Sequence, residues 1–244
     1  MRRRRNNLGR SARQRVRTGA IEIDEAVVND AAKAFANGFP ACGLDPSSEF
    51  VAPPRASTAM PRPQRIPIRD AETGQARNAD VFVIADPEAR SPVHGYNATY
   101  VRPDGGRFDR IVLKVKPGLC MPAYDWAEEI KGILTHEVAH ASDPGILRYR
   151  RAAPSAEDER CEYFNHPAEV TAFVAQARRE ITSFHAVMQA NKLRRSGRTL
   201  RTPADLLRVL SPTYGAMYSC LRPKMKRRFL RMAARVWEEQ KEKL

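Results

Sequence analysis

The stretch Gly132–Asp143, GILTHEVAHASD, constrains the fold of this chain most, because it places two histidines around one glutamate in the order His-Glu-x-x-His. On an α-helix, residues four positions apart lie on one face, so His136 and His140 can direct imidazole nitrogens at one ion. Apart from Glu137, the residues from 133 to 142 that surround them carry no acidic or basic charge, as burial against a core requires. We therefore predict a buried helix that bears a metal ion.

These three side chains suit hydrolysis by a zinc ion, Zn2+. Zinc lowers the pKa of a bound water to about 7 and polarises a carbonyl group. Glu137 is placed to act as the catalytic general base, which takes a proton from the attacking water and returns it to the leaving group. The alternative is an exposed amphipathic helix with ordinary histidines, but two of only five histidines in the chain flank this glutamate at ligand spacing.

A catalytic zinc needs a third protein ligand beside His136 and His140. Metzincins place a histidine six residues after the second motif histidine, where this chain has Ile146, so that arrangement is excluded. Asp143 directly precedes Pro144, where the helix is ending, so we expect it to support a ligand or to be a structural acid at the helix C-terminus rather than to bind the metal itself. The remaining candidate lies on the next helix.

Glu169, in the sequence HPAEVTAF, is the expected third ligand, because it falls in the first turn of the next predicted helix. With Pro167 at the first helical position, a glutamate at the third often forms a capping box instead. His166 at the cap position is a poor partner for such a box, which weakens that alternative. His166 and Glu162 are minor rival ligands, and His185 is expected to be structural.

A developing oxyanion is usually shared between the metal and a protein donor. Tyr163, six residues before Glu169, is the expected donor, and Tyr149 in the preceding loop is the alternative. Ordinary loop packing explains either tyrosine equally well.

The pair ILTHEVAHASD and YFNHPAEVTAF resembles the glutamate-zincin metallopeptidases, particularly the lethal-factor-like domains and related phage-encoded peptidases, over about residues 80–190. The resemblance implies zinc bound by His136, His140 and Glu169, with Glu137 catalytic. In such folds the strand before the motif helix lies at the edge of the cleft and pairs with an extended peptide, and RIVLKVK at 110–116 would be that strand. Its lysines equally suit the protection of an exposed edge from aggregation.

The remaining patterns predict an α+β fold in which a small zincin-like domain combines a short sheet with the motif helix and the third-ligand helix. We expect helices at 20–39, 123–142, 167–189, 202–210 and 223–244, and strands at 79–86 and 110–116 with a turn at 102–108. Seven prolines between 40 and 67 predict an extended linker. The expected divisions are a basic flexible arm at 1–20, a helix and linker at 21–66, the zincin-like domain at 67–193 and a basic helical extension at 194–244.

The net charge of +14 is concentrated at the two ends of the chain. Residues 1–17 contain eight arginines and no acid, and residues 178–235 contain fifteen bases and two acids. Such ends favour contact with nucleic acid, an acidic protein surface or other subunits of an assembly, although a solvated arm and helix face explain them equally well. No helix-turn-helix, RNA-recognition or zinc-finger pattern accompanies the basic residues, so only sequence-independent contact with nucleic acid is expected.

The four cysteines lie far apart without a C-x-x-C pair, so reduced, unpaired thiols are expected. The basic start is followed by no apolar segment of a secretory signal, and no run of eighteen apolar residues occurs, so neither a signal peptide nor a membrane span is predicted. A cytoplasmic or virion location follows.

The leading hypothesis is a soluble zinc-dependent peptidase that cleaves a peptide or protein substrate, with a phage particle as one setting. The alternative is a non-catalytic structural component of a virion or nucleoprotein, which retains the zincin fold as a scaffold and contacts nucleic acid or other subunits through its basic ends.

Overall fold

Four strands form a mixed sheet in the order β2-β3-β5-β4 in the computed structural model, which describes residues 23–43, 50–54, 63–71, 73–101, 107–143, 160–181, 183–200, 205–210 and 212–240. The strands are β2 (Gln64–Arg69), β3 (Ala76–Ala85), β4 (Val93–Val101) and β5 (Arg107–Val115). β3 and β5 are parallel, and the two outer strands pair antiparallel with their neighbours. Two short strands, β1 (Phe50–Val51) and β6 (Met121–Pro122), pair separately.

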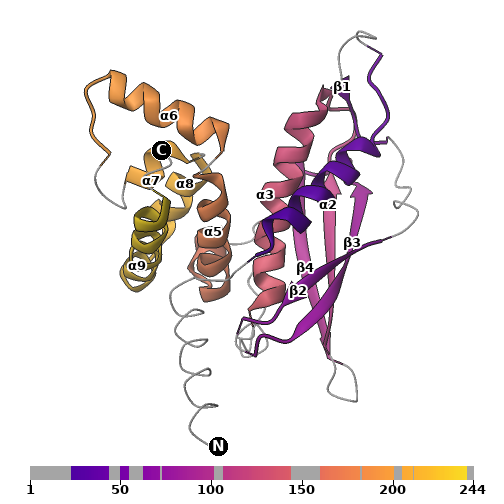
Figure 1. The fold of residues 1–244 in the computed structure, drawn as a ribbon, viewed down its shortest axis with the longest axis horizontal. Helices are drawn as coiled ribbons and strands as arrows, with labels where there is room; N and C mark the ends of the chain where they lie inside the picture. The colour runs from indigo at the N-terminus through magenta and orange to yellow at the C-terminus, as the bar shows by residue number, and fades with distance from the viewer. Residues whose placement is uncertain are drawn as a thin grey trace, which may run out of the picture. The chain divides into compact units, whose positions relative to one another are not determined.

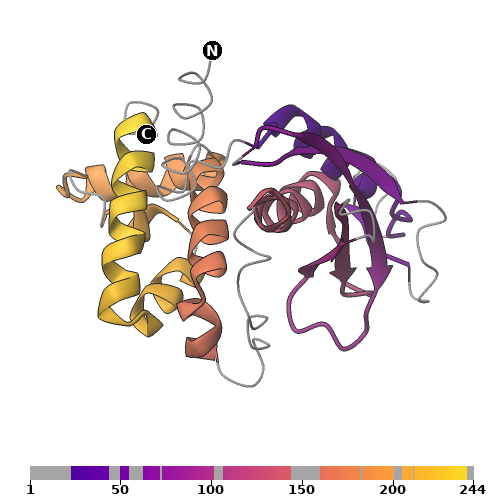
Figure 2. The same ribbon diagram turned by 90° about the horizontal axis from the view of Figure 1, so that it is seen from below.

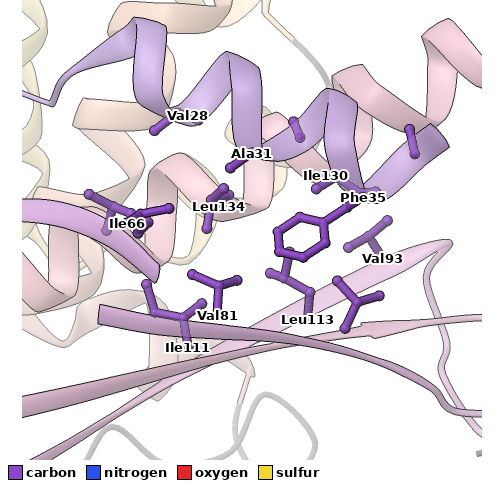
Figure 3. Packing of buried hydrophobic residues seen from close by; sticks show 14 of the residues in the cluster. Val28, Ala31, Phe35, Ile66, Val81, Val93, Ile111, Leu113, Ile130 and Leu134 are labelled. Atoms are coloured by element: carbon purple, nitrogen blue, oxygen red, sulfur yellow. The ribbon is translucent and has the colours of Figure 1, made fainter. Parts of the chain in front are cut away.

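Helices α2 (Glu25–Asn37) and α3 (Ala123–Ser142) lie on one face of this sheet (Figure 1). α2 begins at Asp24, whose carboxylate accepts hydrogen bonds from the backbone N–H groups of the first turn. Alternation along each strand sends every second side chain toward the two helices. The core between them is wholly apolar at its centre, and Figure 3 shows side chains from both layers meeting there. Its labelled members are Val28, Ala31, Phe35, Ile66, Val81, Val93, Ile111, Leu113, Ile130 and Leu134.

Trp126 anchors α3 at its N-terminal half. Its side chain is fully buried, packs edge-to-face on Phe39 at a centroid distance of 5.3 Å, and donates through Nε1 to the carbonyl oxygen of Val51 at 3.0 Å. Burial of a large aromatic side chain contributes about 2–3 kcal/mol, and the satisfied indole N–H removes the penalty that burial would otherwise carry. α3 therefore has a fixed position on the sheet.

The described residues that follow α3 build a second core, which is formed between helices. These helices are α4 (Arg160–Asn165), α5 (Pro167–Glu180), α6 (Phe184–Arg195), α7 (Leu206–Val209), α8 (Pro212–Cys220) and α9 (Pro223–Gln240). α5 and α9 run side by side, as Figure 2 shows. The predicted apolar face of α9 is confirmed, since Phe229, Met232 and Val236 are buried and Met225 is partly buried.

The chain divides into two compact units, which we call the sheet unit (Glu22–Ser142) and the helical unit (the described residues from Asp143 onward). The predicted α+β class is confirmed. The division differs from the boundaries at 66 and 193 expected from the sequence, because α2 packs into the same core as the sheet and α3. None of the helices in the described ranges is both long and apolar enough to cross a membrane.

Three expectations about single elements were wrong. The segment RIVLKVK forms β5, which pairs with β3 on one side and with β4 on the other. β5 therefore lies inside the sheet, and the outer strand beside it is β4. Lys114 of β5 pairs with Asp86 at 2.9 Å and lowers the pKa of that carboxyl, which is a different role from edge protection. The helix expected at 167–189 breaks at Ser183, whose hydroxyl caps α6 by accepting from the N–H of Ala186.

The expectation of free thiols was also wrong. Cys42 pairs with Cys120 in the sheet unit, and Cys161 pairs with Cys220 in the helical unit, with Cα–Cα distances of 6.2 and 4.8 Å. The paired cysteines are 78 and 59 residues apart in sequence, so the local spacing of cysteines does not indicate which of them pair. Each unit is thus closed by its own crosslink.

Removal of either disulfide should therefore lower stability. The variants Cys42→Ser/Cys120→Ser and Cys161→Ser/Cys220→Ser should each lose about 2–4 kcal/mol of unfolding free energy, because a long loop is freed in the unfolded chain. Urea unfolding measures the loss, and thiol titration of the unfolded, unreduced protein should find no reactive cysteine. Four reactive thiols in the parent protein would contradict the pairing.

Candidate metal centre

The second half of α3 is buried on nearly all sides, although it carries three ionisable residues. His136 and Glu137 are each 5% exposed and His140 is 7% exposed. Leu134, Val138 and Ala141 on the same turns belong to the core of the sheet unit, which explains why this part of the helix is drawn inward. Burial of charged or polar groups is costly unless each has a partner, so the three side chains together indicate a site.

The two histidines converge on one point. Their Nε2 atoms lie 3.1 Å apart, and their rings are nearly perpendicular, with centroids 4.8 Å apart. Two nitrogens bound at 2.0–2.1 Å to one tetrahedral zinc ion would lie roughly 3.3–3.4 Å apart. The geometry within α3 therefore fits two ligands of a single metal ion.

Glu137 lies against the outer strand β4 at Gly95. A Cβ atom built on Gly95 would come within 2.8 Å of Cγ and 2.9 Å of Oε1 of Glu137, and within 2.5 Å of the Ile133 side chain. Contacts this short require the neighbouring side chains to shift, so glycine is the residue that accommodates the glutamate here without displacement. The strand thus approaches the helix closely beside the predicted catalytic residue.

Glu169 is buried in the first turn of α5, at 5% exposure. Pro167 is at the start of this helix and His166 is its N-cap, without a side-chain capping bond. The backbone N–H of His166 donates to the carbonyl oxygen of Tyr163 at 3.0 Å, so this N–H is already engaged and a capping box with Glu169 finds no support.

His136, His140 and Glu169 form a buried group whose candidate ligand atoms all lie within 4.8 Å of one another. Two imidazoles and one carboxylate make a donor set typical of catalytic zinc, which keeps a further position open. A metal ion could be held by this group, which is the set of three ligands predicted from the sequence.

The other predicted residues lie nearby in sequence but outside this group. Asp143 is buried at 2% exposure directly after α3. Glu162 is an ion-pair partner of Arg222 with a partly exposed side chain, which argues against metal binding. Tyr163 packs on Phe164, with ring centroids 5.4 Å apart, at the border of the helical core, and its role as an oxyanion donor stays a prediction.

Tyr149 lies outside the described residues, and His185 lies in the first turn of α6. Sequence reasoning missed Gly95 altogether. A glycine inside a strand pattern signals close approach of another chain segment, and VHGYNATYV contains that signal. Because the sequence analysis did not predict a strand at these residues, Gly95 was not identified as a glycine inside a strand.

Comparison of the chain with known protein families, with curated proteins and with solved structures finds no match.

The close approach at Gly95 can be tested without reference to activity. Gly95→Ala should lower the unfolding free energy by about 1–3 kcal/mol, because the added methyl group overpacks the space beside Glu137 and Ile133. Urea unfolding measures the change. Gly43→Ala, at a site with no atom within 4 Å of the added Cβ, is the matched control and should have little effect. Equal stability of the two variants would contradict this packing.

Proposed function

We propose that this protein is a zinc-dependent peptidase in which His136, His140 and Glu169 hold the metal and Glu137 is the general base. The observation that carries the proposal is the buried group of two histidines and one glutamate, with Glu137 on the same helix turn. Zinc bound there would acidify a water molecule and polarise the scissile carbonyl.

Glu137 has the position required of a proton carrier. It directly follows His136 in α3, it is buried, and its side chain lies against Gly95, which has no Cβ to displace it. A carboxylate in this position takes a proton from the attacking water and delivers it to the departing amine. The reaction is hydrolysis of an amide bond, with no covalent enzyme intermediate.

The choice of a peptide as substrate is supported by β4. Only one of its edges is paired within the described part of the sheet, and this strand passes directly beside Glu137 at Gly95. An extended peptide can add to such an edge through main-chain hydrogen bonds, which places a scissile bond near the base. β4 therefore takes the role that the sequence had suggested for β5.

Membership of the glutamate-zincins, as in the lethal-factor-like and phage-encoded peptidases, is part of this proposal. It is supported by the order of the ligands, two from one helix and a glutamate from the next long helix, α5. The two disulfides favour a place of action outside a reducing cytoplasm, such as a virion.

Replacement of the base tests the proposal most sharply. Glu137→Gln should lower kcat/KM by about 10²–10⁴-fold on a quenched-fluorescent peptide library, because the proton carrier is removed. Zinc content, measured by elemental analysis, should be unchanged. Glu129→Gln, an exposed glutamate of the same helix, is the matched control and should keep full activity. Undiminished peptide cleavage by the Glu137→Gln variant would sink the proposal.

A second candidate function is sequence-independent contact with nucleic acid by a structural component, and the surface of α9 favours it. Lys224, Arg227 and Arg231 are exposed at spacings of three and four residues, so they form a stripe along one face. Arginine in particular suits phosphate groups because its planar guanidinium donates two hydrogen bonds at once.

Salt dependence tests this second function. Arg227→Gln/Arg231→Gln should weaken binding to a 30-nucleotide DNA and reduce the slope of log affinity against log salt by about one for each phosphate that is no longer neutralised. Arg235→Gln removes a guanidinium that pairs with Glu239 at 2.9 Å and is the control expected to change little. Binding that is insensitive to salt in the parent protein would exclude this function.

A further inference from the structure

The last turn of α3, which carries His140, is fastened by groups from the β2–β3 hairpin. The final carbonyl groups of a helix have no partner within it. Here the guanidinium of Arg77, on β3, donates to the carbonyl oxygen of Ala141, and the backbone N–H of Ala71 donates to that of Ser142 at 3.0 Å. The two residues that follow His140 are therefore both held from outside the helix.

Arg77 is itself fixed by two carboxylates. Its Nε donates to Oδ2 of Asp109 at 2.7 Å, and a terminal nitrogen lies 3.4 Å from Oδ2 of Asp70. Asp109, on β5, is fully buried, and its other oxygen accepts a hydrogen bond of 2.6 Å from the hydroxyl of Thr99 on β4. One planar guanidinium thus joins β3 and β5 to the end of α3.

The network extends along the outer strand. Thr99 has a single hydroxyl hydrogen, which it gives to Asp109, so its oxygen can only accept, and the amide nitrogen of Asn97 donates to it at 3.3 Å. Asn97 lies two residues from Gly95, on the same face of β4, and Gly95 is the residue that lies against Glu137. The strand beside the base is thereby connected to the turn that carries a ligand.

A buried ion pair of this kind is poor evidence for a stabilising role. Desolvation of both charges largely offsets their attraction, and apolar residues of similar volume often give equal or greater stability. What a guanidinium adds is direction, because its nitrogens point along fixed vectors in one plane. A side chain that fixes geometry is expected where the positions of metal ligands matter. The helical turn to which Arg77 donates contains His140.

We propose that Arg77 and Asp109 are positioning residues of the metal centre, which fix the last turn of α3 against β4 and so set His140 for metal binding. This inference rests on the proposed function, since it needs the zinc site to exist. The network acts through the backbone of the last turn of α3 and through β4.

The test compares a variant that lacks only the Arg77 guanidinium with a variant that lacks both members of the Arg77–Asp109 ion pair. Arg77→Met leaves Asp109 buried without its partner and should both destabilise the protein and weaken zinc binding by about 10–100-fold. Arg77→Met/Asp109→Leu also removes the fully buried carboxylate, and Asp70 still accepts hydrogen bonds from the backbone N–H and hydroxyl of Thr73. Thermal stability should therefore return toward that of the parent while zinc binding stays about 10–100-fold weaker. Zinc affinity is measured by competition with a chromophoric chelator, and stability is measured on the metal-free protein.

Arg65→Met is the matched control, since Arg65 forms an exposed ion pair with Asp80 in the same sheet and its side chain is 69% exposed. It should leave zinc affinity within about twofold of the parent. A double variant that is stable and binds zinc as tightly as the parent would overturn the inference alone. A parent protein that takes up no zinc would overturn the proposed metal site, and this inference with it.

Discussion

The burial of three ionisable side chains within two turns of one helix is the constraint on which the rest of the structure depends. A helix that carries His136, Glu137 and His140 inward has to be packed closely and has to offer each group a partner. The sheet unit meets the first demand with a core of aliphatic side chains under α3. A metal ion shared by the two imidazoles would meet the second for the histidines.

The polar residues of the sheet unit are arranged around this helix in a consistent way. The N-terminal half of α3 lies on apolar strand residues, whereas its last turn is held by Arg77 and the groups behind it. The face of β4 that points toward α3 carries Gly95, Asn97 and Thr99. At such positions a strand with a purely structural role would carry valine or isoleucine. Their small or polar character is explained if this part of the strand serves the site.

The sequence predicted what is local and missed what is not. The bounds of α3 and the convergence of His136 and His140 follow from helical spacing, and the choice of Glu169 as a candidate ligand follows from its place in the first turn of α5. β4 was not predicted because its inward positions 95, 97 and 99 carry no apolar side chain. β2 was not predicted because Pro67 suggested a linker, although an outer strand tolerates an exposed proline. The disulfides and the Arg77–Asp109 pair join residues at least 32 positions apart, and no periodic pattern records such pairings.

X-ray absorption of the zinc-loaded protein tests the central claim most directly, because it reports the atoms bound to the metal without any assumption about substrate. The account predicts a first shell of nitrogen and oxygen atoms at about 2.0–2.1 Å, with the outer-shell scattering of two imidazole rings, and loss of one oxygen donor from the protein in Glu169→Ala. Failure to retain zinc, or a shell containing sulfur at about 2.3 Å, would contradict it.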